Sequence, residues 1–146
     1  MALILLERVA PCPVEQAWSR LTDWPRHAEV VPLTRVTVVT PPPTREGTVF
    51  VARTGVGSLA FDDPMEVAVW QPPRDGGPGM FRLVKRGTFV TGWAEIEVRP
   101  VDGTGSRVVW REELMVRWLP RFLDRPLAYA GRWMFGRAVE GLLRGA

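Results

Sequence analysis

The chain has 146 residues, 46% of them hydrophobic, and a net charge of only +3. This length predicts one domain over residues 1–146, and no apolar run reaches the roughly 18 residues of a membrane span. The basic residues are scattered among acidic ones, which argues against a nucleic-acid partner.

The few sulfur and imidazole groups limit the chemistry further. One cysteine and one histidine allow neither an internal disulfide nor a catalytic triad or multi-His metal site. We therefore expect no metal and no cofactor. The first residues are apolar, lack a basic segment and soon reach Glu7, so they indicate a strand rather than a signal peptide, and we expect a cytoplasmic protein.

Hydrophobic periodicity predicts two short helices after the first strand and one long helix at the end of the chain. Between them, β-branched and aromatic segments separated by Gly- and Pro-containing turns predict six further strands. The expected strands cover residues 3–9, 35–40, 48–54, 59–70, 80–86, 89–98 and 107–118, and the expected helices cover 13–21, 24–31 and the segment after Pro120.

Particular residues support these boundaries. Pro13 suits the first turn of helix 13–21, and Asp124 is the expected N-cap of the last helix. Pro64 predicts a bulge or kink within strand 59–70, and the glycines of 102–105 predict a hairpin turn. The apolar stripe of the first helix is expected at Val14, Ala17, Trp18 and Leu21.

The element order β-αα-ββββββ-α predicts an α+β fold. Six consecutive strands with hairpin-length links form an antiparallel sheet, which must bury one face. The long C-terminal helix is the natural cover for that face.

Four segments carry a resemblance to a known family. They are 7–24 (ERVAPCPVEQAWSRLTDW), 61–67 with 70–73 (FDDPMEV and WQPP), 85–92 (KRGTFVTG) and 107–113 (RVVWREE). Together they resemble the START-like superfamily, also called SRPBCC or polyketide cyclase/dehydrase-like. The resemblance implies a helix-grip fold, in which a seven-stranded antiparallel sheet wraps around the C-terminal helix and encloses a ligand cavity. The family includes aromatase/cyclases, lipid and steroid carriers and hormone receptors, so the fold alone does not choose a function.

Strand alternation predicts which side chains face this cavity, because residues i and i+2 share a face. The more apolar face of strand 107–118 includes Trp110, Leu114 and the single acidic residue Glu112. Leu127 and Met134 face the same space from the last helix. The other residues expected on the inner face are Asp63, Met65, Val67, Val69, Phe81, Leu83, Lys85 and Gly92.

The charged members of this set are candidate catalytic residues. Lys85 and Glu112 lie on strands flanking 89–98 and are expected to meet across Gly92, with Asp63 reaching the same space. Such a carboxyl is either paired with Lys85 or titrates near neutral pH as an acid or base; the alternative is a structural or solvated pair. His27 is expected either at the surface or as an acid/base group at the cavity entrance.

These features leave two functions open. The first is binding of a hydrophobic or aromatic small molecule, polyketide- or lipid-like, with Trp110, Met65, Val67, Phe81, Leu83, Gly92, Leu114, Leu127 and Met134 as ligand contacts. The second is a polyketide cyclase/aromatase-type enzyme that uses Glu112, Lys85, Asp63 and His27 as proton-transfer groups. Another face of the last helix carries Arg121, Arg125 and Arg132, with Trp133 and Phe135. We expect this face to be solvated; the alternative is contact with an anionic membrane for lipid transfer.

Overall fold

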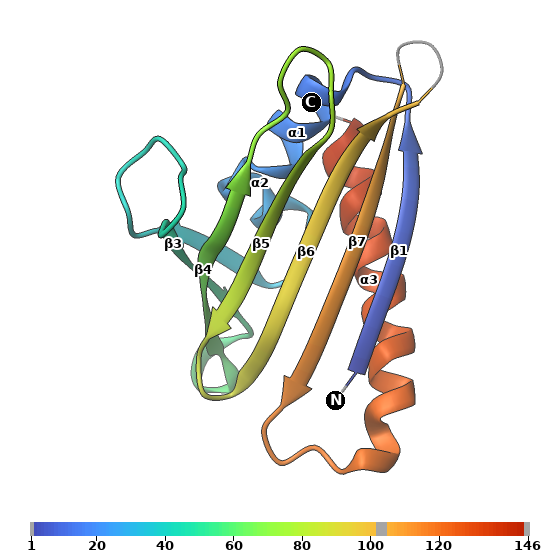
Figure 1. The fold of residues 1–146 in the computed structure, drawn as a ribbon. Helices are drawn as coiled ribbons and strands as arrows, with labels where there is room; N and C mark the ends of the chain where they lie inside the picture. The colour runs from blue at the N-terminus through green and yellow to red at the C-terminus, as the bar shows by residue number, and fades with distance from the viewer. Residues whose placement is uncertain (1, 102–104, 145–146) are drawn as a thin grey trace.

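The computed structural model describes residues 2–101 and 105–144. Within them, seven strands form one antiparallel sheet that accompanies three α-helices and two 3-10 turns (Figure 1). The strands are β1 (Ala2–Ala10), β2 (Thr34–Val38), β3 (Val49–Thr54), β4 (Phe61–Gln71), β5 (Gly79–Arg86), β6 (Val90–Pro100) and β7 (Ser106–Val116). The helices are α1 (Val14–Leu21), α2 (Trp24–Val30) and α3 (Asp124–Arg144), and the 3-10 turns are η1 (Gly57–Leu59) and η2 (Arg121–Leu123). Of the expected hairpin turn at 102–105, residues 102–104 lie outside the described part.

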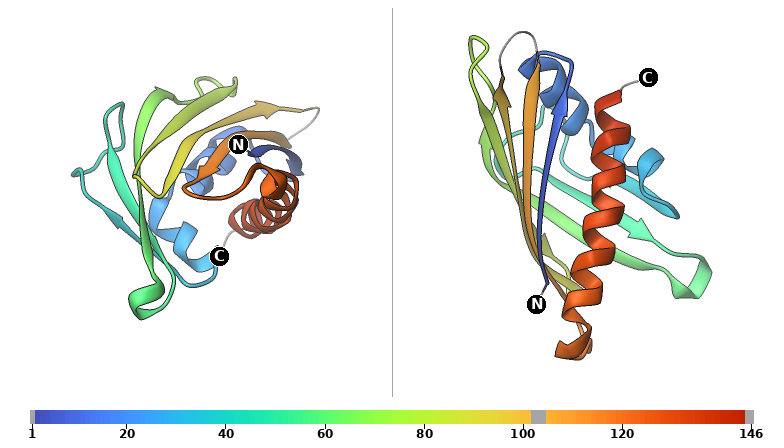
Figure 2. Two further views of the ribbon diagram at one scale, coloured as in Figure 1. Left: turned by 90° about the horizontal axis from the view of Figure 1, so that it is seen from below. Right: turned by 90° about the vertical axis from the view of Figure 1, so that its right-hand side faces the viewer.

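The sheet order is β1-β7-β6-β5-β4-β3-β2. Strands β2 to β7 follow one another as antiparallel neighbours, and α1 and α2 carry the chain from β1 at one edge to β2 at the other. Figure 2 shows the sheet curving around its concave side, with α3 running along that side next to β1. The predicted α+β helix-grip architecture is therefore confirmed.

Two helix starts differ in detail from the sequence prediction. Helix α1 buries the predicted stripe, but Pro13 is its N-cap in an extended conformation and not a residue of its first turn. Asp124 is not an N-cap, because η2 runs directly into α3 and gives Asp124 helical angles of φ −61 and ψ −42. Both differences are one-residue shifts that leave the buried faces in place.

The expected bulge does not lie at Pro64, because the pairing of β4 with β3 runs through this residue without a register shift. Pro64 pairs with Val51 of β3, and the first pair between β4 and β5 is Met65 with Lys85. The proline therefore lies just beyond that ladder, where its missing N–H breaks no hydrogen bond between the two strands.

The irregularity in β4 lies at Ala68 instead. Val67 pairs with Leu83 and Val69 pairs with Arg82, so Ala68 is an extra residue in the β4–β5 ladder. Such a bulge reverses the alternation of the strand that follows it. Val69, predicted to face inward, therefore shares the outer face with Arg82, and Trp70 takes the inner face.

An aromatic cluster fills the interior next to α1. The ring centroids of Trp18 and Trp70 are 5.0 Å apart, and Phe81 meets both rings. Trp24 stacks on Phe50 at 4.5 Å with 14° between the ring planes. Aromatic contacts of this kind add stability beyond the area they bury. This end of the interior is solid, and the open space lies toward α2, β2 and the first half of α3.

Candidate functional site

A cavity of about 450 Å³ lies between the inner face of the sheet, α2 and α3. Most of its wall is apolar. Its polar members are His27, Thr34, Thr54, Asp63, Lys85 and Glu112. Its apolar members are Val31, Pro32, Val36, Phe50, Ala52, Phe61, Met65, Leu83, Phe89, Val90, Ala94, Trp110, Leu114, Val116, Leu127, Met134, Phe135 and Ala138.

Glu112 is the most deeply buried acid of the wall. It sits in the middle of β7, between Ile4 of β1 and Ala94 of β6, and is 2% exposed. Its Oε1 accepts a hydrogen bond from Trp110 Nε1 at 3.1 Å, and its Oε2 has no partner among the described residues.

The surroundings of Glu112 favour its neutral form. Burial raises the pKa of Glu112, while the charge of Lys85 and the Trp110 hydrogen bond lower it and the charge of Asp63 raises it again. The net direction is upward, because the desolvation of a fully buried carboxylate outweighs one cation and one indole donor. A neutral carboxylic acid in an apolar cavity can donate a hydrogen bond or a proton.

Lys85 forms its ion pair with Asp63 and not with Glu112. Lys85 Nζ lies 2.6 Å from Asp63 Oδ2, with side chains only 7% and 12% exposed. The register explains this correction to the predicted Lys85–Glu112 pair. Lys85 is opposite Met65, so Asp63 is its diagonal neighbour on β4, whereas Glu112 lies opposite Ala94, away from the Lys85–Gly92 pair.

Three predicted ligand contacts lie outside the cavity wall. Val67 and Phe81 are 0% and 2% exposed within the packed core. Gly92 has φ +131, and a Cβ there would collide with the Glu113 carbonyl oxygen. Its missing side chain therefore serves the close approach of β6 to β7 and leaves no gap between Lys85 and Glu112. The other predicted contacts and the four candidate catalytic residues all line the cavity.

His27 lies in the cavity wall rather than on the open surface. Its Nε2 is 2.8 Å from the Leu21 carbonyl oxygen, which can only accept, so this nitrogen carries the proton. Burial lowers the pKa of His27, more than the Leu21 carbonyl and Asp23 raise it, with Arg26 lowering it further. The ring is therefore held neutral by its surroundings.

Helix α3 supplies the opposite wall, and here the sequence assigned one aromatic residue to the wrong face. Phe135, expected beside Trp133 and the arginines, stacks on Trp110 with ring centroids 5.5 Å apart and 16° between the planes. Trp133 is exposed, as its position suggested. No cavity residues were predicted on β2 or β3. The structure places Val36 of β2 and Phe50, Ala52 and Thr54 of β3 in the wall, and the alternation along these strands could have indicated them.

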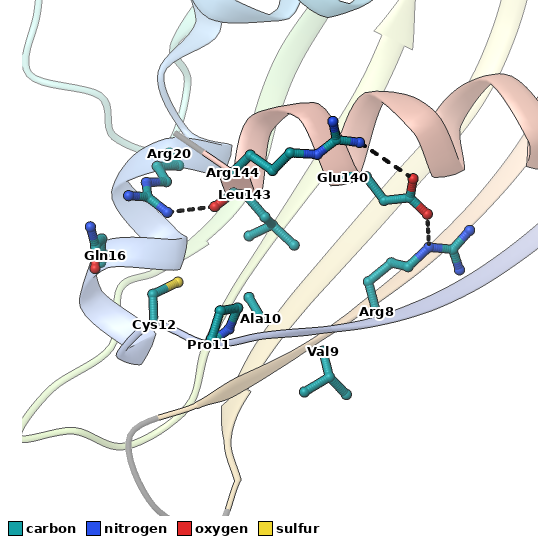
Figure 3. A pocket seen from close by; sticks show the side chains of 10 residues that line it. All are labelled: Arg8, Val9, Ala10, Pro11, Cys12, Gln16, Arg20, Glu140, Leu143 and Arg144. Carbon is teal, nitrogen blue, oxygen red and sulfur yellow. Dashed lines mark hydrogen bonds and ion pairs between the residues drawn. The ribbon is translucent and has the colours of Figure 1, made fainter. Parts of the chain in front are cut away.

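A second hollow of about 620 Å³ lies outside the sheet, between β1, α1 and the end of α3 (Figure 3). Arg8 Nε and Arg144 Nη2 approach Glu140 at 3.0 and 3.9 Å, and Arg20 donates to the Leu143 carbonyl oxygen. These bonds fasten the end of α3 to β1 and α1. No predicted site residue lines this hollow, and its charged side chains, Arg8, Arg20, Glu140 and Arg144, all have partners, so we place the candidate site in the inner cavity.

The described residues carry neither a membrane-spanning helix nor a cluster of metal ligands. No helix among them is long and apolar enough to cross a membrane. No three of their His, Cys, Asp or Glu side chains gather as metal ligands.

Neither a known family model nor a curated protein matches the sequence, whereas many solved structures match the fold. The Zhui aromatase/cyclase from Streptomyces sp. R1128 superposes with a TM-score of 0.70 at 13% identity, over 97% of this chain and 90% of that one. A START superfamily protein from Mycobacterium smegmatis gives 0.76 at 9% identity, over 99% and 98%. A Thermus thermophilus protein gives 0.76 at 16% identity, over 97% and 94%. The chain therefore has the START-like fold, as its sequence motifs indicate.

Proposed function

We propose that the protein binds a hydrophobic or aromatic small molecule, polyketide- or lipid-like, between the sheet and α3. The observation that carries this proposal is the 450 Å³ cavity with its largely apolar wall. Ligand sites commonly enclose about 300–1,000 Å³ and have apolar walls with a few polar groups. The Zhui neighbour, which shares this fold, is named as an aromatase/cyclase, and this supports a polyketide-like or aromatic ligand.

A fluorescent probe tests the binding. N-phenylnaphthylamine is uncharged and brightens in apolar surroundings, so it should bind with a stoichiometry of about one and quench Trp110, which lines the cavity. Trp110→Phe should remove that part of the quenching while the probe still binds.

A pair of matched variants places the probe. Ala138→Leu fills cavity volume from α3 and should weaken probe binding, because Ala138 lines the cavity. Ala130→Leu makes the same change at an exposed position of the same helix and should not. Equal affinities in both variants, with both folded by circular dichroism, would rule the cavity out as the binding site.

A second candidate is acid–base catalysis of the cyclase/aromatase type. The observation that favours it is the buried, partly unpartnered Glu112 carboxyl with its raised pKa. Enolisation, aldol closure and dehydration need a shaped pocket and one or two proton-transfer groups. A diketone that closes to an absorbing enone would report turnover; Glu112→Gln should abolish the rate and leave probe binding intact. No acceleration by the wild-type protein would reject the enzyme and leave the binding proposal standing.

A further inference from the structure

Two buried carboxyl oxygens, on side chains that line the cavity, have no hydrogen-bond partner among the described residues. They are Glu112 Oε2 and Asp63 Oδ1. Buried polar atoms are almost always satisfied in native proteins, so each exception needs an explanation. We propose that these two oxygens form a polar subsite that selects an uncharged ligand bearing a hydroxyl or carbonyl oxygen. This inference rests on the proposed function, because it names the ligand class of the same cavity.

Glu112 supplies the donor of this subsite. Its Oε1 already accepts from the Trp110 indole, which places the proton of the neutral acid on Oε2. That proton needs an acceptor, and a ligand carbonyl or hydroxyl oxygen provides one. The Trp110 bond fixes the plane of the carboxyl group, so the donor direction is set before a ligand enters.

Asp63 supplies the acceptor. Lys85 Nζ holds its Oδ2 at 2.6 Å and so fixes the orientation of the carboxylate. The remaining oxygen, Oδ1, can only accept while the ion pair is intact, which calls for a hydroxyl donor. Asp63 and Glu112 lie on β4 and β7, with two strands between them on the curved sheet. A ligand with a hydroxyl or carbonyl oxygen that reaches one of these groups fits this wall.

The charges of the wall exclude an anionic ligand. Its titratable members are His27, Asp63, Lys85 and Glu112. Asp63 and Lys85 neutralise each other, and the Leu21 carbonyl holds the proton of a neutral His27. No cation remains among the described wall residues to compensate a buried carboxylate, such as that of a fatty acid, and an uncompensated buried charge is strongly unfavourable. The wall therefore matches oxygenated, uncharged molecules.

Three naphthalenes of nearly equal size test this selection by displacement of N-phenylnaphthylamine at pH 7. Naphthol carries the hydroxyl, methylnaphthalene carries none, and naphthoate is an anion. We expect naphthol to bind about tenfold more tightly than methylnaphthalene, as one well-formed hydrogen bond in the cavity would give, and naphthoate to bind most weakly. A cavity without the subsite gives the opposite order for the first two, because burying an unbonded hydroxyl is costly.

Variants at Glu112 assign the effect. In Glu112→Gln, the amide oxygen can still accept from Trp110 Nε1 and the amide nitrogen supplies an N–H donor, so the preference for naphthol should remain. Glu112→Leu removes the donor and should abolish it, while methylnaphthalene still binds. A wild-type protein that binds methylnaphthalene as tightly as naphthol overturns the subsite and leaves the proposed function intact. A protein that binds none of the neutral probes overturns both.

Discussion

The Asp63–Lys85 ion pair should be the most strongly coupled charge pair of the described residues. At 2.6 Å and an effective dielectric constant of about 20, the Coulomb attraction is about 6 kcal/mol. Desolvation of both groups offsets most of this attraction, so the pair itself adds little net stability. Removing one partner leaves the other charge buried, which costs about 3–5 kcal/mol.

A double-mutant cycle measures this coupling. Lys85→Met should lower the free energy of unfolding by this cost of about 3–5 kcal/mol. Adding Asp63→Leu should restore most of the lost stability, because no unpaired charge remains. Urea unfolding at pH 7 gives the values, provided that the m-values of the variants agree. The predicted coupling is therefore about 2 kcal/mol or more.

The chain contains a matched control on the neighbouring residue. Asp62 pairs with Arg53 at 3.2 Å, but its side chain is 53% exposed and that of Arg53 is 57% exposed. Exposed pairs contribute about 0–1 kcal/mol, so the Asp62–Arg53 cycle should give a small coupling. If both cycles give the same small value, Asp63 and Lys85 are not a buried pair, and the polar wall described above is wrong.

Three further predictions concern single residues. Because burial raises the pKa of Glu112, the native state retains this proton more strongly than the unfolded chain. The contribution of Glu112 to stability should therefore be fully present below about pH 4.3 and be lost as the pH rises through the native pKa. In Glu112→Gln, this part of the pH dependence should disappear. Urea midpoints across this range test it, and identical slopes would contradict it. The pKa of His27 should lie below the ordinary 6.5 in an NMR titration. Its contribution to stability should be present above about pH 6.5 and disappear as the pH falls through the native pKa. A pKa at or above the ordinary value would show that the imidazole is exposed to solvent. Gly92→Ala should lower the free energy of unfolding by at least ~2 kcal/mol more than Gly47→Ala. Both glycines have positive φ, but only at Gly92 would an added Cβ collide with backbone. Equal losses of stability in thermal unfolding would contradict the close approach of β6 and β7.

The sequence predicted the inner face of β7 correctly because the alternation of that strand is unbroken. Trp110, Glu112 and Leu114 all line the cavity, as expected from their spacing. The same rule misplaced Val69, because the extra residue at Ala68 changes the phase in the middle of β4. No glycine or proline marks the bulge at Ala68 in the sequence. Pro64, the residue type that usually indicates a bulge, lies in the same strand without causing one.

The identity of the charge partners was beyond the reach of periodicity. Alternation places Lys85, Asp63 and Glu112 on one face, but the choice between the two acids depends on the register between strands. That register sets Lys85 opposite Met65 and Glu112 opposite Ala94. Gly92 shows the complementary error: a missing side chain was interpreted as free volume, although the neighbouring backbone occupies it.

The bulge at Ala68 also decides which side chains of β4 point into the interior. Before it, Asp63 and Met65 face the open space; after it, Trp70 turns inward and meets Trp18. Without the bulge, β4 would direct Trp70 to the solvent, and this indole ring would be missing from the packed end of the interior next to α1. One inserted residue thus places an indole ring in the packed end of the interior next to α1, while the open space stays at the other end, beside Asp63 and Met65.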